Sequence, residues 1–167
     1  MTESPFNLIT EPWIRVRDGE GVRDVSLREC FAEAHVIRAL AGEVATQDAA
    51  ILRLLLAILH RSVADLPEYA VDVWRGLWAA PTLPLVAIDQ YLDRVEGRFN
   101  LFDDVAPFLQ VADLSAAKTS GLVKLVADVP DGAPFFTTRA GVELESLSLS
   151  EAARWLVHVQ AFDPSGI

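Results

Sequence analysis

The sequence predicts an α+β fold that is predominantly helical, and three observations lead to that class. Apolar residues make up 51% of the 167 residues and charged residues 23%, so the chain can enclose a hydrophobic core. Two short runs of alternating apolar and charged residues flank a glycine-bearing turn near the start. Several longer segments have apolar residues at helical spacing. Together these observations favour small β elements beside a buried central helix.

The β elements are expected at the amino-terminal end. The segment 6–16 ends in Trp13-Ile14-Arg15-Val16-Arg17, and Val22 to Val25 forms a second apolar and charged run. Between them, Asp18-Gly19-Glu20-Gly21 supplies the glycines that a tight turn needs. The pattern predicts a β-hairpin.

The first two helices follow directly. Ser26 and Glu29 have the spacing of a capping box, in which each side chain accepts a free amide of the helix start, so a short helix is predicted to about Ala34. The segment 47–63 is the predicted central helix. Its apolar residues are too many for a single stripe, which predicts that protein covers most of the helix circumference; they occupy positions 51, 52, 54, 55, 56, 58, 59 and 63.

Three further helices and two irregular segments complete the prediction. Helices are expected at 71–79 and 85–95, separated by Pro81 and Pro84, and from the capping box Ser148 to Glu151 through about Gln160. The segment 98–110 is expected to be irregular or short and extended. The segment 112–146 contains five glycine and proline breakers and predicts a long loop, which is typical of a functional or disordered region.

Composition restricts the class of protein. Cys30 is the only cysteine, so no intramolecular disulfide or thiolate metal cluster is expected. Residues 1–5 do not resemble a secretory signal, and no apolar stretch is long enough for a membrane span, so a cytoplasmic location is expected. With 14 Lys and Arg against 24 Asp and Glu, the net charge of −10 argues against a domain that coats nucleic acid by itself. Any contact with nucleic acid is therefore expected to be local.

No catalytic or cofactor motif is found. The sequence has no phosphate-binding glycine loop, no dinucleotide fingerprint and no nucleophile elbow. His35, His60 and His158 lack an oriented partner and are expected to be structural or on the surface. Asp103 and Asp104 suit a hard cation, but adjacent acids in a loop are more often solvated. We therefore expect no enzyme activity, no metal and no cofactor.

Aromatic residues offer two interpretations. Trp74 and Trp78 are four apart on one helix, which favours packing against the core over stacking on bases. In the long loop, Lys118 and Lys124 lie in an acid-free window at 114–127, and both are candidate phosphate contacts. The loop also carries aromatic, hydroxyl and cationic groups suited to single-stranded RNA or a duplex backbone: Phe135, Phe136, Thr137, Thr138 and Arg139. In the alternative interpretation, the two phenylalanines anchor the loop to the core.

Eight short blocks, in order and at their spacing, resemble the CasA family, the large subunit of type I-E CRISPR Cascade complexes. The resemblance extends across nearly the whole chain. The blocks are FNLITEPWI at 6–14, VSLRE at 25–29 with AH at 34–35, ATQ at 45–47, LRLLLAILHR at 52–61, FNLF at 99–102, PFLQ at 107–110, LSEAARWL at 149–156 and QAF at 160–162.

The resemblance implies a subunit about three times this length. Residues 1–167 would be the amino-terminal part of its large mixed α and β domain, and its carboxy-terminal four-helix bundle would be absent. The family implies a non-catalytic DNA-binding and RNA-binding role in antiviral defence. It further implies recognition of the protospacer-adjacent motif, contact with the 5′ end of the guide RNA and positioning of the helicase-nuclease. The implied partners are other Cascade subunits, guide RNA, target double-stranded DNA and that helicase-nuclease.

Residues are carried over from the family one at a time. The aromatic before its nucleic-acid-contacting loop best matches Phe136, with Phe135 as the alternative, and the loop falls at about 137–147. Its glycine loop, which approaches the minor groove, would begin near Gly166. Relatives with zinc-binding cysteines near this loop differ from this chain, which has none there. The alternative function, from another class, is a helical protein-interaction scaffold without direct nucleic-acid contact.

Overall fold

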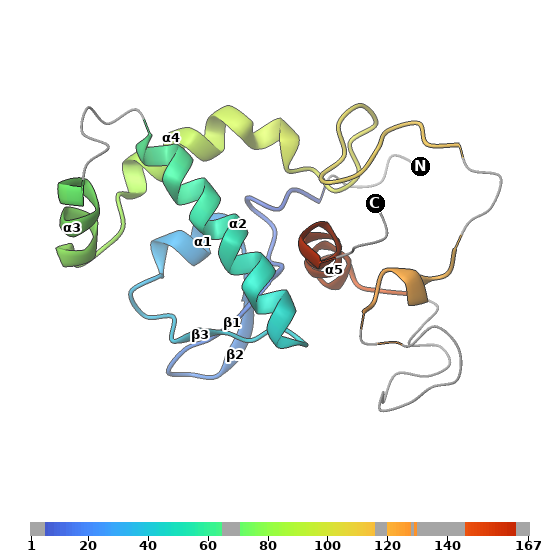
Figure 1. Ribbon diagram of the computed structural model, residues 1–167, viewed down its shortest axis with the longest axis horizontal. Coiled ribbons are helices and arrows are strands. Elements are labelled where there is room, and N and C mark those ends of the chain that lie inside the picture. The colour runs from blue at the N-terminus through green and yellow to red at the C-terminus, as the bar shows by residue number, and fades with distance from the viewer. Residues whose placement is uncertain (1–5, 65–70, 116–119, 128, 130–145, 163–167) are drawn as a thin grey trace.

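The computed structural model describes residues 6–64, 71–115, 120–127, 129 and 146–162, and shows a small sheet packed beside helices (Figure 1). Its elements, in chain order, are β1 (Ile14–Arg17), β2 (Val22–Val25), α1 (Leu27–Ala32), β3 (Ala39–Leu40), α2 (Ala45–Val63), α3 (Val71–Ala79), α4 (Leu85–Val95), η1 (Glu96–Arg98), η2 (Leu122–Lys124) and α5 (Leu149–Phe162). The predicted α+β class with a predominance of helix is confirmed.

The sheet has the order β2-β1-β3, with both pairs antiparallel. The predicted hairpin is confirmed, because Ile14 pairs with Val25 and Arg17 pairs with Val22 across the turn. Asp18 closes the turn, since its carboxylate accepts the backbone N–H groups of Glu20 and Gly21. The short strand β3 was not predicted, because two residues carry too little pattern.

The predicted capping box at the start of α1 is confirmed. The Glu29 amide donates to Ser26 Oγ at 3.2 Å, and the Ser26 amide donates to Glu29 Oε2 at 2.8 Å. The same backbone hydrogen bond from Ser26 lowers the pKa of the Glu29 carboxyl. The helix itself ends at Ala32, two residues before the predicted end.

The other predicted helices are also present. The bounds of α3 and α4 coincide with the predicted segments, α2 begins two residues earlier than predicted, and α5 continues to Phe162. At the start of α5 the amide of Glu151 donates to Ser148 Oγ at 3.3 Å, as the capping-box spacing predicts. The segment 98–110 is irregular, as predicted, apart from the end of η1 and a bridge between Asn7 and Asn100.

The core lies between the sheet and helices α2, α4 and α5. Its largest fully buried side chains include Trp13 and Ile14 from the first strand region and Ile51, Ile88 and Leu92 from the helices. Helix α2 is central, because it packs against both α4 and α5. A second, smaller cluster joins Trp155 of α5 to Val126 and Val129 of the long loop.

Two expectations about burial are wrong. Protein does not cover most of the circumference of α2, because Leu52 is 50% exposed and Leu56 is 44% exposed. Nor does Trp78 pack against the core, because its side chain is 93% exposed. In both cases a packing partner is lacking among the described elements. Helices α4 and α5 leave part of α2 uncovered, and α3 lies at the edge of the molecule with no buried residue (Figure 1).

Candidate functional site

Most of the residues predicted to contact nucleic acid lie outside the described part of the chain. These are Lys118, Phe135, Phe136, Thr137, Thr138, Arg139 and Gly166. Lys124 is the exception. The structure therefore does not test whether these side chains come together, and their roles stay predictions.

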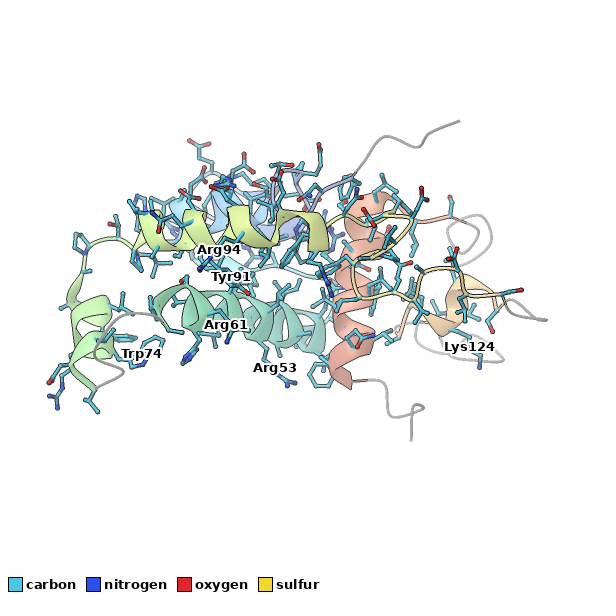
Figure 2. All side chains as sticks on the ribbon, turned by 90° about the horizontal axis from the view of Figure 1, so that it is seen from above. Arg53, Arg61, Trp74, Tyr91, Arg94 and Lys124 are labelled. Carbon is cyan, nitrogen blue, oxygen red and sulfur yellow. The ribbon has the colours of Figure 1, made fainter. Side chains whose placement is uncertain are left out.

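Lys124 is held on a short, well-anchored support. It is exposed at the end of η2, where its amide donates to Gly121 O at 3.1 Å. Two residues later, Val126 is fully buried against Trp155 of α5. This contact fixes the segment around Lys124 to α5. Lys124 itself lies at the end of the molecule opposite α3 (Figure 2).

A cationic and aromatic surface that sequence reasoning did not single out lies on α2. Arg53, His60 and Arg61 are exposed residues of this helix. Arg53 and Arg61 are labelled in Figure 2. The His60 ring lies 4.5 Å from the ring of Trp74 on α3, measured between centroids. That ring contact joins α3 to the carboxy-terminal half of α2, so the surface extends over both helices.

The neighbouring helix α4 adds one more cation and one more aromatic ring. The Arg94 guanidinium carbon lies 5.8 Å from the centroid of the Tyr91 ring, which is within range of a cation–π interaction. Arg94 is exposed, whereas Tyr91 packs partly against the core. Arginine, tyrosine and tryptophan are enriched in binding surfaces, so α2, α3 and α4 together offer a candidate interface.

The three histidines occupy structural or surface positions. His35 is exposed after α1, and His60 contacts Trp74. His158 is buried, its Nε2 lies 3.0 Å from Thr46 Oγ1, and its ring meets Trp155 edge to face. Burial lowers the pKa of His158, because the charged imidazolium loses its hydration there. The role of His158 is therefore to join α2 to α5.

Asp103, the first of the paired acids in the irregular segment, stabilises its own loop. The Asp103 carboxylate accepts the amides of Ala106 at 2.7 Å and Val105 at 2.9 Å, and these bonds lower its pKa. Among the described residues, no group of three histidine, cysteine or acidic side chains is placed to hold a metal ion. Local backbone capping is thus the observed use of Asp103.

A buried cation links the sheet to the last helix, and the sequence analysis missed it. Arg154 of α5 is 4% exposed, and its Nη1 donates to the carbonyl oxygen of Trp13 at 3.0 Å. Its guanidinium also pairs with Glu43 at 3.4 Å and Asp24 at 3.5 Å. The available signal was that apolar residues surround Arg154 in the sequence, which is unusual for a solvated arginine.

Similarity to known proteins places the chain among the CRISPR-associated proteins. The family described as CRISPR-associated protein Cse1 matches residues 7–167, which is almost the entire chain. The chain therefore belongs to the Cse1 family, also named CasA, and the resemblance carried by the sequence blocks is confirmed.

Individual relatives agree with that assignment. The CRISPR-associated protein CasA/Cse1 of Thermus thermophilus is 37% identical over 166 residues, which cover 97% of this chain and 32% of the relative. The crystal structure of Thermobifida fusca Cse1 superposes with a TM-score of 0.83 at 46% identity, covering 95% of this chain and 30% of that one. The Cse1 structure from Acidimicrobium ferrooxidans gives a TM-score of 0.79 at 36% identity, covering 98% and 30%. The chain thus spans about a third of the length of these relatives.

A structure described as a CRISPR RNA-guided surveillance complex contains a chain with the same fold. The TM-score is 0.76 at 23% identity, over 93% of this chain and 34% of that one.

No described helix combines the length and apolar character required to cross a membrane.

Proposed function

We propose that this chain acts as part of the non-catalytic large subunit of a type I-E CRISPR surveillance complex, Cascade, in cytoplasmic antiviral defence. In that role it contacts the 5′ end of the guide RNA, helps to recognise the protospacer-adjacent motif in double-stranded target DNA, and helps to position the helicase-nuclease. The observation that carries the proposal is the family match over residues 7–167. Residues 1–167 correspond, in this proposal, to the amino-terminal part of the family's large domain, without the four-helix bundle.

The charge distribution supports a local contact within a larger assembly. A net charge of −10 repels phosphates at long range, so the chain is poorly suited to bind nucleic acid by itself. Phosphate contacts are therefore assigned to the acid-free segment with Lys118 and exposed Lys124, and base or sugar contacts to the loop at 135–139. Gly166 begins the segment that approaches the minor groove, where a residue without a side chain allows a close approach.

The guide-RNA contact is tested with Phe136→Ala. Loss of a ring that stacks on a base or anchors the RNA-facing loop should weaken binding to the cognate guide-bearing complex, assembled without its large subunit, by about tenfold. Binding is measured by surface plasmon resonance. Phe102→Ala, which removes a ring that is 41% exposed elsewhere, is the matched control and should bind like the parent chain. Unchanged binding by Phe136→Ala together with loss in Phe135→Ala would move the contact to Phe135, and unchanged binding in both would refute it.

The DNA contact is tested with the double change Lys118→Glu and Lys124→Glu. If each lysine neutralises one phosphate, the slope of log affinity against log salt for the assembled complex should become shallower by about 1.8. Electrophoretic mobility shift assays over a series of salt concentrations measure that slope. The control, Arg17→Glu with Arg98→Glu, changes net charge by the same amount at two exposed positions outside α2, α3 and α4. Equal slopes for the lysine and arginine variants would mean that only overall charge matters.

A second candidate function rests on the exposed apolar surface. Trp78 is 93% exposed and Leu52 is 50% exposed, which is typical of a surface that binds another protein. This favours the helical protein-interaction scaffold as the alternative. The scaffold predicts that Phe136→Ala and the lysine changes leave both guide-RNA and target-DNA binding unchanged.

A further inference from the structure

The irregular segment around η1, which runs into the yellow loop of Figure 1, forms a hollow of about 650 Å³. We call it the 98–110 hollow, because residues 98, 99 and 105–110 line it. Two of these residues, Phe99 and Phe108, are buried and stack with their ring centroids 5.2 Å apart. Val105 and Leu109 also line it, but they are 85% and 40% exposed. A hollow of this size with apolar walls can hold a side chain of a bound partner.

Local hydrogen bonds hold the lining of the hollow in place. The Asp103 carboxylate accepts the amide of Val105, and Gln110 Nε2 donates to Leu101 O at 2.9 Å. These bonds close the segment on itself, so the hollow does not depend on a partner for its shape. A surface that is already ordered loses little conformational entropy on binding, which favours a role in recognition.

Large apolar side chains remain exposed along the same stretch of chain. Besides Val105, Val111 is 71% exposed and Leu114 is 75% exposed. A single exposed apolar residue is common on a protein surface and needs no explanation. Several within one short segment that also forms a hollow are typical of a surface that binds another molecule.

The charges around the hollow indicate what kind of partner fits. From 99 to 117 the sequence contains three aspartates and no lysine or arginine, and Arg98 is the one cation among the residues that line the hollow. Asp104 directly precedes Val105 and is exposed, and its carboxylate has no hydrogen bond or ion pair within the described residues. A complementary partner would bring Lys or Arg to Asp104 and Asp113.

The same charges favour a polypeptide over a nucleic acid. A phosphate backbone that followed this segment would meet Asp103, Asp104 and Asp113, with one arginine to offset them. A base could enter an apolar hollow, but its phosphates would then lie beside carboxylates. A polypeptide can place an apolar side chain in the hollow and a cation beside it, which matches both features of the surface.

We propose that the 98–110 hollow binds a separate polypeptide that presents one large apolar side chain flanked by Lys or Arg. The apolar side chain contacts Val105 and Leu109, and the flanking cations pair with Asp104 and Asp113. The net charge of −10 acts in the same direction, because it attracts a cationic partner at long range. The inference does not rest on contact with guide RNA or DNA, and it stands if that function fails.

Peptide titrations followed by methyl NMR of the chain test the proposal. Each short peptide carries Leu, Ile, Met, Phe or Trp between two Lys residues, and a matched series has two Glu residues instead. The methyl resonances of Val105 and Leu109 report on the hollow. Val22 and Leu56 are the matched controls, because they are 49% and 44% exposed and lie on β2 and α2.

At least one Lys-flanked peptide is expected to shift the Val105 and Leu109 resonances and to leave the control resonances unchanged. It should bind about fivefold more tightly than its Glu-flanked counterpart, because exposed charge pairs contribute modestly. Asp104→Lys should remove that preference. Glu20→Lys makes the same change of charge at an exposed acid of the hairpin turn and should preserve it.

Absence of shifts with every Lys-flanked peptide would overturn the proposal, and so would equal affinity for the two series. Shifts that appear only with a single-stranded oligonucleotide, or that grow with the concentration of the chain alone, would also contradict it, because the occupant would then be nucleic acid or a second copy. The titration is repeated on a chimera in which the chain replaces the matched third of Thermobifida fusca Cse1. Loss of the shifts there would assign the hollow to the rest of that polypeptide, against the proposal.

Discussion

Replacing Arg154 with alanine is expected to lower the free energy of unfolding by about 3–5 kcal/mol, because it breaks a buried ion network from one side. Arg154 is 4% exposed, and its guanidinium contacts the Trp13 carbonyl, Glu43 and Asp24. Without it, the Glu43 carboxylate, whose side chain is 15% exposed, loses one ion pair in a place with little access to water. The change also leaves a cavity between α5 and the sheet.

Urea unfolding followed by circular dichroism measures this effect. Arg28→Ala is the matched control, because Arg28 also makes two ion pairs, with Asp89 at 2.6 Å and Asp93 at 2.7 Å, but is 37% exposed. Exposed ion pairs contribute about 1 kcal/mol or less, since water and salt screen them. Comparable losses in the two variants would show that burial of Arg154 does not determine its contribution.

Trp13→Phe is expected to destabilise the fold by about 1–2 kcal/mol more than Trp155→Phe. Both side chains are fully buried, so both substitutions remove the same atoms from a packed environment. The difference lies in the indole N–H. Trp13 Nε1 donates to Leu8 O at 2.8 Å, whereas Trp155 Nε1 is buried and has no hydrogen-bond partner among the described residues. Replacing Trp13 with phenylalanine therefore removes a hydrogen bond, whereas replacing Trp155 removes a buried donor that has no acceptor among the described residues.

Chemical denaturation of the two variants under the same conditions provides the comparison. The difference between their unfolding free energies separates the hydrogen bond from the cavity term, which is similar for both. A larger loss at Trp155 than at Trp13 would mean that the Trp155 N–H has an acceptor, for instance an ordered water.

The parts of the fold that were predicted from sequence depend on neighbours in the chain. The hairpin turn at Asp18 and the capping box of Ser26 and Glu29 are formed by residues no more than three apart. The apolar spacing of α3 and α4 likewise lies within each segment. These features were predictable because the groups that stabilise them are close in sequence.

The features that were missed depend on contacts between distant segments. Arg154 bonds to Trp13, 141 residues away, and to Glu43, 111 residues away, so its apolar neighbours in α5 could indicate burial but not these partners. Strand β3 forms because the Arg38 amide meets Arg17 O and the Ala41 amide meets Arg15 O, which again requires the fold. Burial of Trp78 was wrongly predicted because apolar character indicates that a residue can be covered, not that a partner is present.

For the candidate site, the sequence predicted the protein family but not the position of the exposed surface. The blocks from 6 to 162 are sufficient to assign the Cse1 family, because order and spacing accumulate over the whole chain. The basic and apolar surface of α2 was not foreseen, since the same leucines that indicate a core helix also form its exposed side. The exposure of a helix depends on how many other elements pack against it, and the spacing of its apolar residues does not give that number.

Helix α3 has no buried residue, and this affects how the molecule would respond to a partner. A helix of nine residues with little packing has hardly any stability of its own, so it opens locally at a small free-energy cost. Most of the stability of α3 in a complex would then come from whatever covers Trp78. The partner would lose some affinity to the ordering of α3, and the folding of this one helix would become coupled to assembly while the rest of the core stays unchanged.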